Sequence, residues 1–171
     1  MLKKTSVLSF IAIVGVTSLS VASAASLKMG SYSNAPSGKE IEAGNYDAAI
    51  VLARTPIARH DVEAALIAAT NLCVAYTVKR ELDGAYEACG EALTLARRVD
   101  KATGARFRST ATARALTNRG VLRAVSGDTL GAAADFREAA RSSGNWAAPS
   151  RNLAYLESSP THRLALARAA N

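Results

Sequence analysis

TNLCVAYTVKRELDGAYEACGEAL, residues 70–93, predicts two helices whose buried positions carry small side chains. Cys73, Ala85, Cys89 and Ala92 stand where a wider core would carry leucine. Because the distance between two packed helices depends on the side chains at their contact, small residues allow the two backbones to approach closely. We therefore expect a tight antiparallel pair of helices, with Cys73 opposite Ala85.

The same spacing recurs further along the chain. Asn71 precedes Ala85 by 14 residues, and Cys89 and Ala92 follow Ala85 at four and seven residues. A second copy places the same spacings at Asn118, Ala132, Phe136 and Ala139. A third asparagine, Asn152, lies 34 residues after Asn118. Spacing that repeats in this way indicates a helical repeat.

The period and the small-residue positions resemble the tetratricopeptide repeat (TPR), whose 34-residue unit is two antiparallel helices. The family's positions are occupied by Leu72, Cys73, Tyr76, Ala85, Cys89 and Ala92 in one unit and by Gly120, Gly127, Ala132, Phe136 and Ala139 in the next. The chain departs from the family in lacking an opening tryptophan, in carrying Arg119 and Arg123 at apolar and aromatic positions, and in the extra residues 100–112. The resemblance covers about residues 40–170 and implies an all-α fold, a short α-solenoid of antiparallel helical hairpins. A generic alanine-rich helical bundle is the alternative.

Apolar periodicity and its interruptions by glycine, proline and aspartate predict the individual helices. They are expected near residues 39–54, 62–79, 83–99, 109–126, 129–142 and 147–158, with a short last helix from residue 161. Short connections make successive helices antiparallel neighbours.

Residues 1–24 have the features of a cleavable signal peptide. Lys3 and Lys4 precede an apolar run at 7–16, and small residues follow at 21–25. The run is shorter than the roughly 20 residues that span a bilayer. We therefore expect a soluble protein exported to a bacterial periplasm. Residues 25–39, rich in serine and glycine, predict a flexible linker before a helical repeat domain at 40–171.

The charge of the chain excludes few partners. Without residues 1–24 it keeps 19 basic and 14 acidic residues, a net charge of +5. This balance is compatible with weak contact with an anionic membrane surface. Because the arginines are scattered along helices without interleaved aromatic residues, we expect no nucleic-acid partner.

Cys73 and Cys89 are the only cysteines. An exported compartment permits a disulfide between them. The expected register offsets them by about one helical turn, however, which favours buried thiols that pack as small hydrophobes.

The resemblance to the TPR family implies a concave face, lined by the first helix of each unit, that binds a peptide or partner protein. Carried over to this chain, the lining residues are Ile67, Thr70, Asn71, Val74, Thr77, Arg114, Thr117, Asn118, Val121, Arg151, Asn152 and Tyr155. They suit an extended segment whose backbone is held by asparagine amides. The asparagines could instead bond to neighbouring backbone within the fold. The alternative function is a structural or self-associating envelope protein that uses its basic surface or its terminal hairpins.

An enzyme is not expected, and neither is a metal or a cofactor. His60 and His162 have no partner at metal-ligand spacing, and the sequence contains no nucleophile elbow or phosphate-binding loop. Asp61, Glu63 and Asp128 suit the beginnings of helices. Trp146 is expected to pack the last hairpin.

Overall fold

The computed structural model describes residues 27–55, 61–103 and 110–160. These residues form helices and connections, with no strand among them. The helices are α1 (Pro36–Glu42), α2 (Tyr46–Ala53), α3 (Val62–Lys79), α4 (Leu82–Thr103), α5 (Thr110–Val125), α6 (Thr129–Ser142) and α7 (Ala148–Ser158). The expected all-helical class is confirmed. The signal peptide and the helix expected from residue 161 lie outside the described residues.

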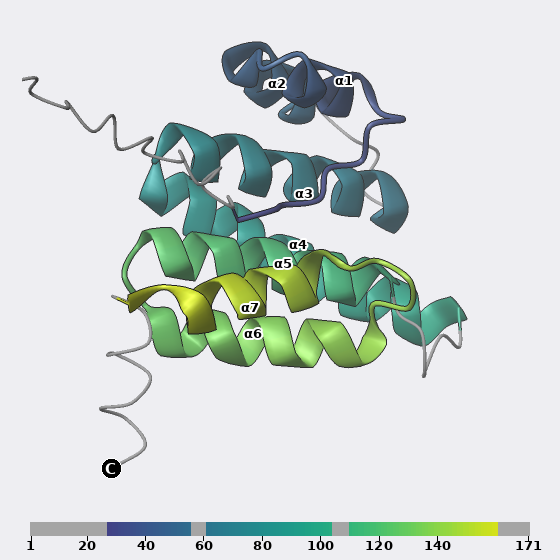
Figure 1. Cartoon of the computed structure of the whole chain (residues 1–171). Helices are drawn as coiled ribbons and strands as arrows, with labels where there is room; N and C mark the ends of the chain where they lie inside the picture. The colour runs from purple at the N-terminus through teal and green to yellow at the C-terminus, as the bar shows by residue number, and fades with distance from the viewer. Residues whose placement is uncertain (1–26, 56–60, 104–109, 161–171) are drawn as a thin grey trace, which may run out of the picture.

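Successive helices pack against each other, as short connections require (Figure 1). Alternate helices also meet, because α3 contacts α1 and α5, and α5 contacts α7. The helix expected at 39–54 is in fact two, α1 and α2. Gly44 separates them with φ +80°, a left-handed conformation that ends the first helix. Helix α4 continues to Thr103, beyond its expected end at residue 99.

Two helices begin at the predicted aspartates. The Asp61 carboxylate accepts a hydrogen bond from the Ala64 N–H at the start of α3, and Asp128 accepts one from the Gly131 N–H at the start of α6. Each satisfies a backbone donor that the first turn of a helix leaves unpaired. The role expected of Asp61 and Asp128 is confirmed.

Helix α3 is the central helix of the array. Among the described helices it alone is long and apolar enough to cross a membrane. It packs against α2, α4 and α5, and its buried residues include Leu66, Cys73 and Tyr76. These contacts account for its apolar composition without a membrane.

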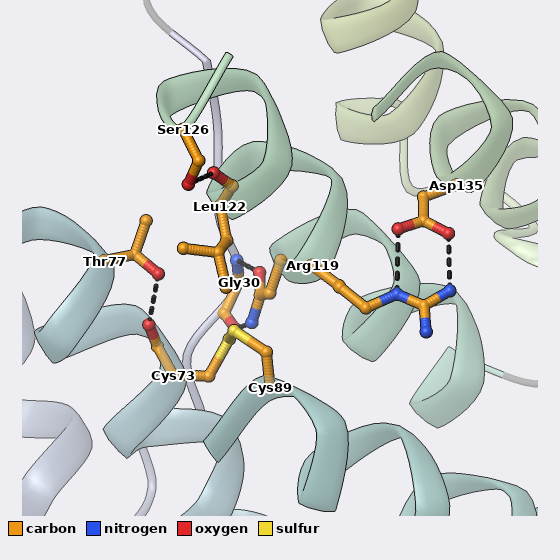
Figure 2. Close-up of a disulfide and its surroundings, with 9 residues drawn as sticks. Gly30, Cys73, Thr77, Cys89, Arg119, Leu122, Ser126 and Asp135 are labelled. Carbon is orange, nitrogen blue, oxygen red and sulfur yellow. Dashed lines mark hydrogen bonds and ion pairs between the residues drawn. A yellow bond between two sulfur atoms is a disulfide. The ribbon is translucent and has the colours of Figure 1, made fainter. Parts of the chain in front are cut away.

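A disulfide joins α3 to α4, so the preference for free thiols was wrong. Cys73 and Cys89 are fully buried, and their Cα atoms are 4.7 Å apart, within reach of a disulfide (Figure 2). The helices cross closely enough at these small residues to remove the expected offset of one turn. The disulfide belongs to a core cluster with Ala85 and Leu122, which extends from α3 and α4 into α5.

Reduction of this disulfide should destabilise the fold. The bond joins residues 16 apart, and closing a loop of this size contributes about 3 kcal/mol by restricting the unfolded chain. Urea unfolding of the oxidised and reduced chain should differ by this amount. The Cys73→Ala/Cys89→Ala variant should be insensitive to the reductant. Equal midpoints for oxidised and reduced wild type would show that the bond contributes nothing.

A second close helix contact joins α5 to α6. A Cβ atom placed on Gly120 would lie 2.5 Å from Phe136 Cε1 and 2.8 Å from its Cδ1. Phe136 is fully buried, so its ring has little freedom to move away. Glycine is therefore required at position 120 because the ring occupies the space of a side chain.

The Gly120→Ala variant should lose about 1–3 kcal/mol of unfolding free energy, because a methyl group overpacks this contact. Gly90→Ala is the matched control. Gly90 lies within α4 with open space where a Cβ would be, and alanine is favoured there by about 1 kcal/mol. Thermal denaturation of the two variants should therefore shift in opposite directions; a shift in the same direction would contradict the packing described.

Arg119 and Arg123 both bind a buried carboxylate. Arg119 donates two hydrogen bonds to Asp135, at 2.9 and 2.6 Å (Figure 2). Arg123 Nη1 donates a third at 3.0 Å. Asp135 is 2% exposed, so its charge requires such partners. The Asp135 carboxylate in turn raises the pKa of Arg119. The three residues tie α5 to α6.

Candidate functional site

Residues 27–32, here called the extended segment, lie across the array (Figure 1). They contact α7, α5 and α3 in that order, through Lys28, Gly30 and Tyr32. A flexible linker is expected at residues 25–39, of which the structure describes residues 27–39. Residues 27–32 are bonded to three helices, and α1 begins at Pro36.

Three buried asparagines hold the extended segment, and together they are called the asparagine ladder. Asn152, on α7, accepts from the Lys28 N–H and donates to the Lys28 carbonyl, both at 2.8 Å. Asn118, on α5, makes the same pair of bonds with Gly30, both at 2.8 Å. Asn71, on α3, accepts from the Tyr32 N–H at 2.8 Å and donates to the Tyr32 carbonyl at 3.4 Å.

The ladder replaces the neighbouring strand that an extended chain normally has. In an antiparallel pair of strands, opposed residues exchange two hydrogen bonds, and the side-chain amide of asparagine offers the same acceptor and donor. Every second residue of the segment is bonded by a different helix. Two residues of an extended chain span about 6.6 Å, which is the distance between neighbouring bonded positions. These hydrogen bonds involve only backbone N–H and C=O groups, and every residue except proline has both.

Side chains of the extended segment complete the helical core. Leu27 and Met29 pack against a cluster that includes Val121 and Leu156. Met29 also packs against the cluster that contains the disulfide. Tyr32 packs against a third cluster, between α3, α4 and α5. The segment therefore touches all three parts of the core.

Arg114, on α5, binds the segment through its side chain. Its guanidinium lies over the Tyr32 ring, 4.2 Å from the ring centroid, and over the Trp146 ring at 6.0 Å. Its Nη1 donates to the Ser31 carbonyl at 2.5 Å. Burial raises the pKa of Tyr32, and the neighbouring Arg114 guanidinium lowers this pKa by a smaller amount.

A tight turn connects the extended segment to α1. The Ala35 N–H donates to the Tyr32 carbonyl at 3.2 Å, and a Cβ on Gly38 would lie only 1.9 Å from that oxygen. Asn71 also donates to the Ser37 hydroxyl at 2.8 Å. Asn71 therefore holds the end of the segment and the beginning of α1 together.

The structure brings together part of the predicted lining. Asn71, Arg114 and Asn118 contact the extended segment directly, while Val121 and Tyr155 belong to the cluster against which Leu27 and Met29 pack. Thr77 and Thr117 donate to carbonyls of their own helices, at Cys73 and Ala113. Thr70 and Val74 are buried, and Arg151 is exposed. The sequence left two roles open for the asparagines, contact with a partner's segment and bonding to backbone within the fold. In the structure they bond to backbone of the chain itself.

The occupant was missed from sequence. Leu27 and Met29 alternate with Lys28 and Gly30, which is the pattern of an extended chain with one apolar side. Composition rich in serine and glycine obscured this short signal. Trp146, expected only to pack the last hairpin, lies against Gly30 and Arg114.

The described residues hold no group of three histidine, cysteine or acidic side chains placed to bind a metal ion. His60 and His162 lie outside the residues described.

No protein-family model matches this chain, and comparison with curated proteins and with solved structures finds no match either. Function must therefore be inferred from the geometry of the asparagine ladder.

Replacement of the central asparagine should free the middle of the extended segment. Asn118→Ala removes both hydrogen bonds to Gly30, a loss of about 2 kcal/mol and roughly 30-fold faster native-state exchange of the Gly30 amide hydrogen. NMR hydrogen exchange measures this directly. Asn145→Ala, in the exposed turn before α7, is the control and should leave the rate unchanged. Unchanged protection of Gly30 in Asn118→Ala would mean that the ladder does not hold the segment.

Proposed function

We propose that this chain is a non-enzymatic, TPR-like interaction module of the bacterial periplasm. In this proposal the asparagine ladder binds an extended segment of a partner protein, and the chain's own residues 27–32 occupy it until the partner displaces them. The observation that carries the proposal is the bonding of Lys28, Gly30 and Tyr32 to three alternate helices, α7, α5 and α3, through backbone atoms alone. A receptor of this kind accepts any chain that can lie extended and supply the same atoms.

The arrangement of helices supports the solenoid part of the proposal. Pairs of adjacent helices are stacked so that α1, α3, α5 and α7 meet in succession. A solenoid of hairpins has this order, and its first helices supply an extended binding surface. The small residues at the α3–α4 and α5–α6 contacts are those that the TPR pattern requires.

Two observations support export. The first 24 residues have the composition of a signal peptide. Cys73 and Cys89 form a buried disulfide, a bond that persists in oxidising compartments such as the periplasm and is rare in the cytosol.

The covalent connection sets the conditions for displacement. A segment joined to its receptor by a short connection competes at an effective concentration of roughly millimolar. A partner therefore binds either with high affinity or after the extended segment has been released. The ladder would be closed by default and open only to a strong competitor.

Self-association is the second candidate, because every copy of the chain carries a segment that fits the ladder. Exchange of residues 27–32 between two copies would give a dimer with the same hydrogen bonds. The tight turn at Tyr32–Ala35 opposes exchange, because Gly38 packs against the Tyr32 carbonyl within one chain. We therefore favour binding of a different protein.

The proposal is tested with a full-length chain whose own segment is weakened. Leu27→Asp/Met29→Asp, here called the released variant, places charges where both side chains pack against the core. Fluorescence anisotropy then measures binding of a labelled peptide with the sequence of residues 26–34. The released variant should bind the peptide at least about tenfold more tightly than wild type, because internal competition is lost.

Two further variants make the result specific. Asn118→Ala in the released variant should weaken peptide binding roughly 30-fold, because both hydrogen bonds to the position of Gly30 are lost. Ser33→Asp/Asn34→Asp, which adds the same charge at exposed positions, should bind like wild type. Analytical ultracentrifugation of wild type distinguishes the second candidate, since exchange would give a stable dimer. A released variant that is folded, with its Gly30 amide exchanging freely, and yet binds no peptide would overturn the proposed function.

A further inference from the structure

The position of Gly30 leaves little space for a side chain. A Cβ atom there would lie 3.0 Å from Trp146 Cζ2 and 3.2 Å from Arg114 Cγ, shorter than ordinary contacts between carbon atoms. The same residue exchanges two hydrogen bonds with Asn118. Asn118 thus holds the Gly30 backbone, while Trp146 and Arg114 occupy the space where a side chain would be.

Tyr32, two positions after Gly30, contacts the Arg114 guanidinium. Arg114 lies over the Tyr32 ring and also donates a hydrogen bond to the Ser31 carbonyl. This hydrogen bond orients the guanidinium over the ring. An aromatic side chain satisfies this site, and an aliphatic one loses the attraction between the cation and the ring.

Apolar side chains of residues that precede Gly30 also contact the helices. Leu27 and Met29 share one side of the extended chain and pack against the same cluster, beside Tyr155 and Leu153. Lys28, between them, is exposed, and its bonds to Asn152 use backbone atoms alone. The face therefore distinguishes positions 27 and 29 from position 28.

We propose that the face formed by α3, α5 and α7 selects partner segments that carry glycine at the position of Gly30, apolar residues one and three positions before it, and an aromatic residue two positions after it. This inference rests on the proposed function and adds a sequence preference to it. The ladder supplies binding to the backbone, while Trp146, Arg114 and the apolar cluster supply selection. The occupant is an extended protein segment in an apolar-x-apolar-glycine-x-aromatic pattern.

The test uses the released variant as receptor and four labelled peptides based on residues 26–34. One has the native sequence, and the others carry Gly30→Ala, Tyr32→Ala or Lys28→Gln. We expect the Gly30→Ala and Tyr32→Ala peptides to bind at least about tenfold more weakly than the native peptide. The Lys28→Gln peptide should bind within about twofold, because that side chain is exposed.

The outcomes separate the inference from the proposed function. Equal binding of all four peptides would overturn the sequence preference and leave a receptor that reads backbone only. Equal weakening by Lys28→Gln would also overturn it, since the exposed position would then matter as much as the enclosed one. Failure of every peptide to bind would overturn the proposed function, and the inference with it. Trp146→Ala in the receptor provides a direct check, because it should restore binding of the Gly30→Ala peptide toward the native value.

Discussion

An extended chain that packs on helices leaves its backbone N–H and C=O groups unpaired. The side-chain hydrogen bonds that pair them organise this structure. The N–H and C=O groups of a helix interior are already bonded to each other, so helices cannot pair with an extended chain as a strand would. Side-chain amides must take the place of that strand. Asn71, Asn118 and Asn152 do so from the alternate helices α3, α5 and α7, and this sets the position and direction of residues 27–32. The burial of these three asparagines thus has a structural reason.

The helical part of the fold follows from local patterns that the sequence states clearly. Alanine, glycine and cysteine at spacings of four and seven predict the close contacts at Cys73 and Gly120, and Asp61 and Asp128 predict where helices begin. The division into α1 and α2 was harder to see, because Gly44 interrupts a segment whose periodicity continues across it. The disulfide was missed for a different reason. Register along a helix is known from sequence to about a residue, whereas a separation of 4.7 Å between Cα atoms depends on how the two helices cross.

Only part of the candidate site was predictable from the sequence, because the asparagines and the extended segment have different sequence patterns. The asparagines recur in the sequence and can be recognised by their spacing. The extended segment has no repeat, and its alternation of apolar residues is too short to stand out among serine and glycine. Its partners also lie far away in sequence, 124 residues in the case of Lys28 and Asn152. Local periodicity carries no information about such a pairing, and a resemblance to repeat proteins indicates a receptor without indicating what occupies it.

The pairing of Lys28 with Asn152 also sets an order of events during folding. Residues 27–32 are synthesised before any helix that receives them, and their contacts are completed only when α7 is in place. At a synthesis rate of roughly 5–20 residues per second, the 124 residues between these partners correspond to a wait of about 6–25 s. During that time, the helical hairpins form from contacts between near neighbours in sequence, while Leu27 and Met29 remain available to chaperones or to neighbouring chains. Residues 27–32 therefore precede all of the described helices in sequence, yet they are secured only when the last of these helices is in place.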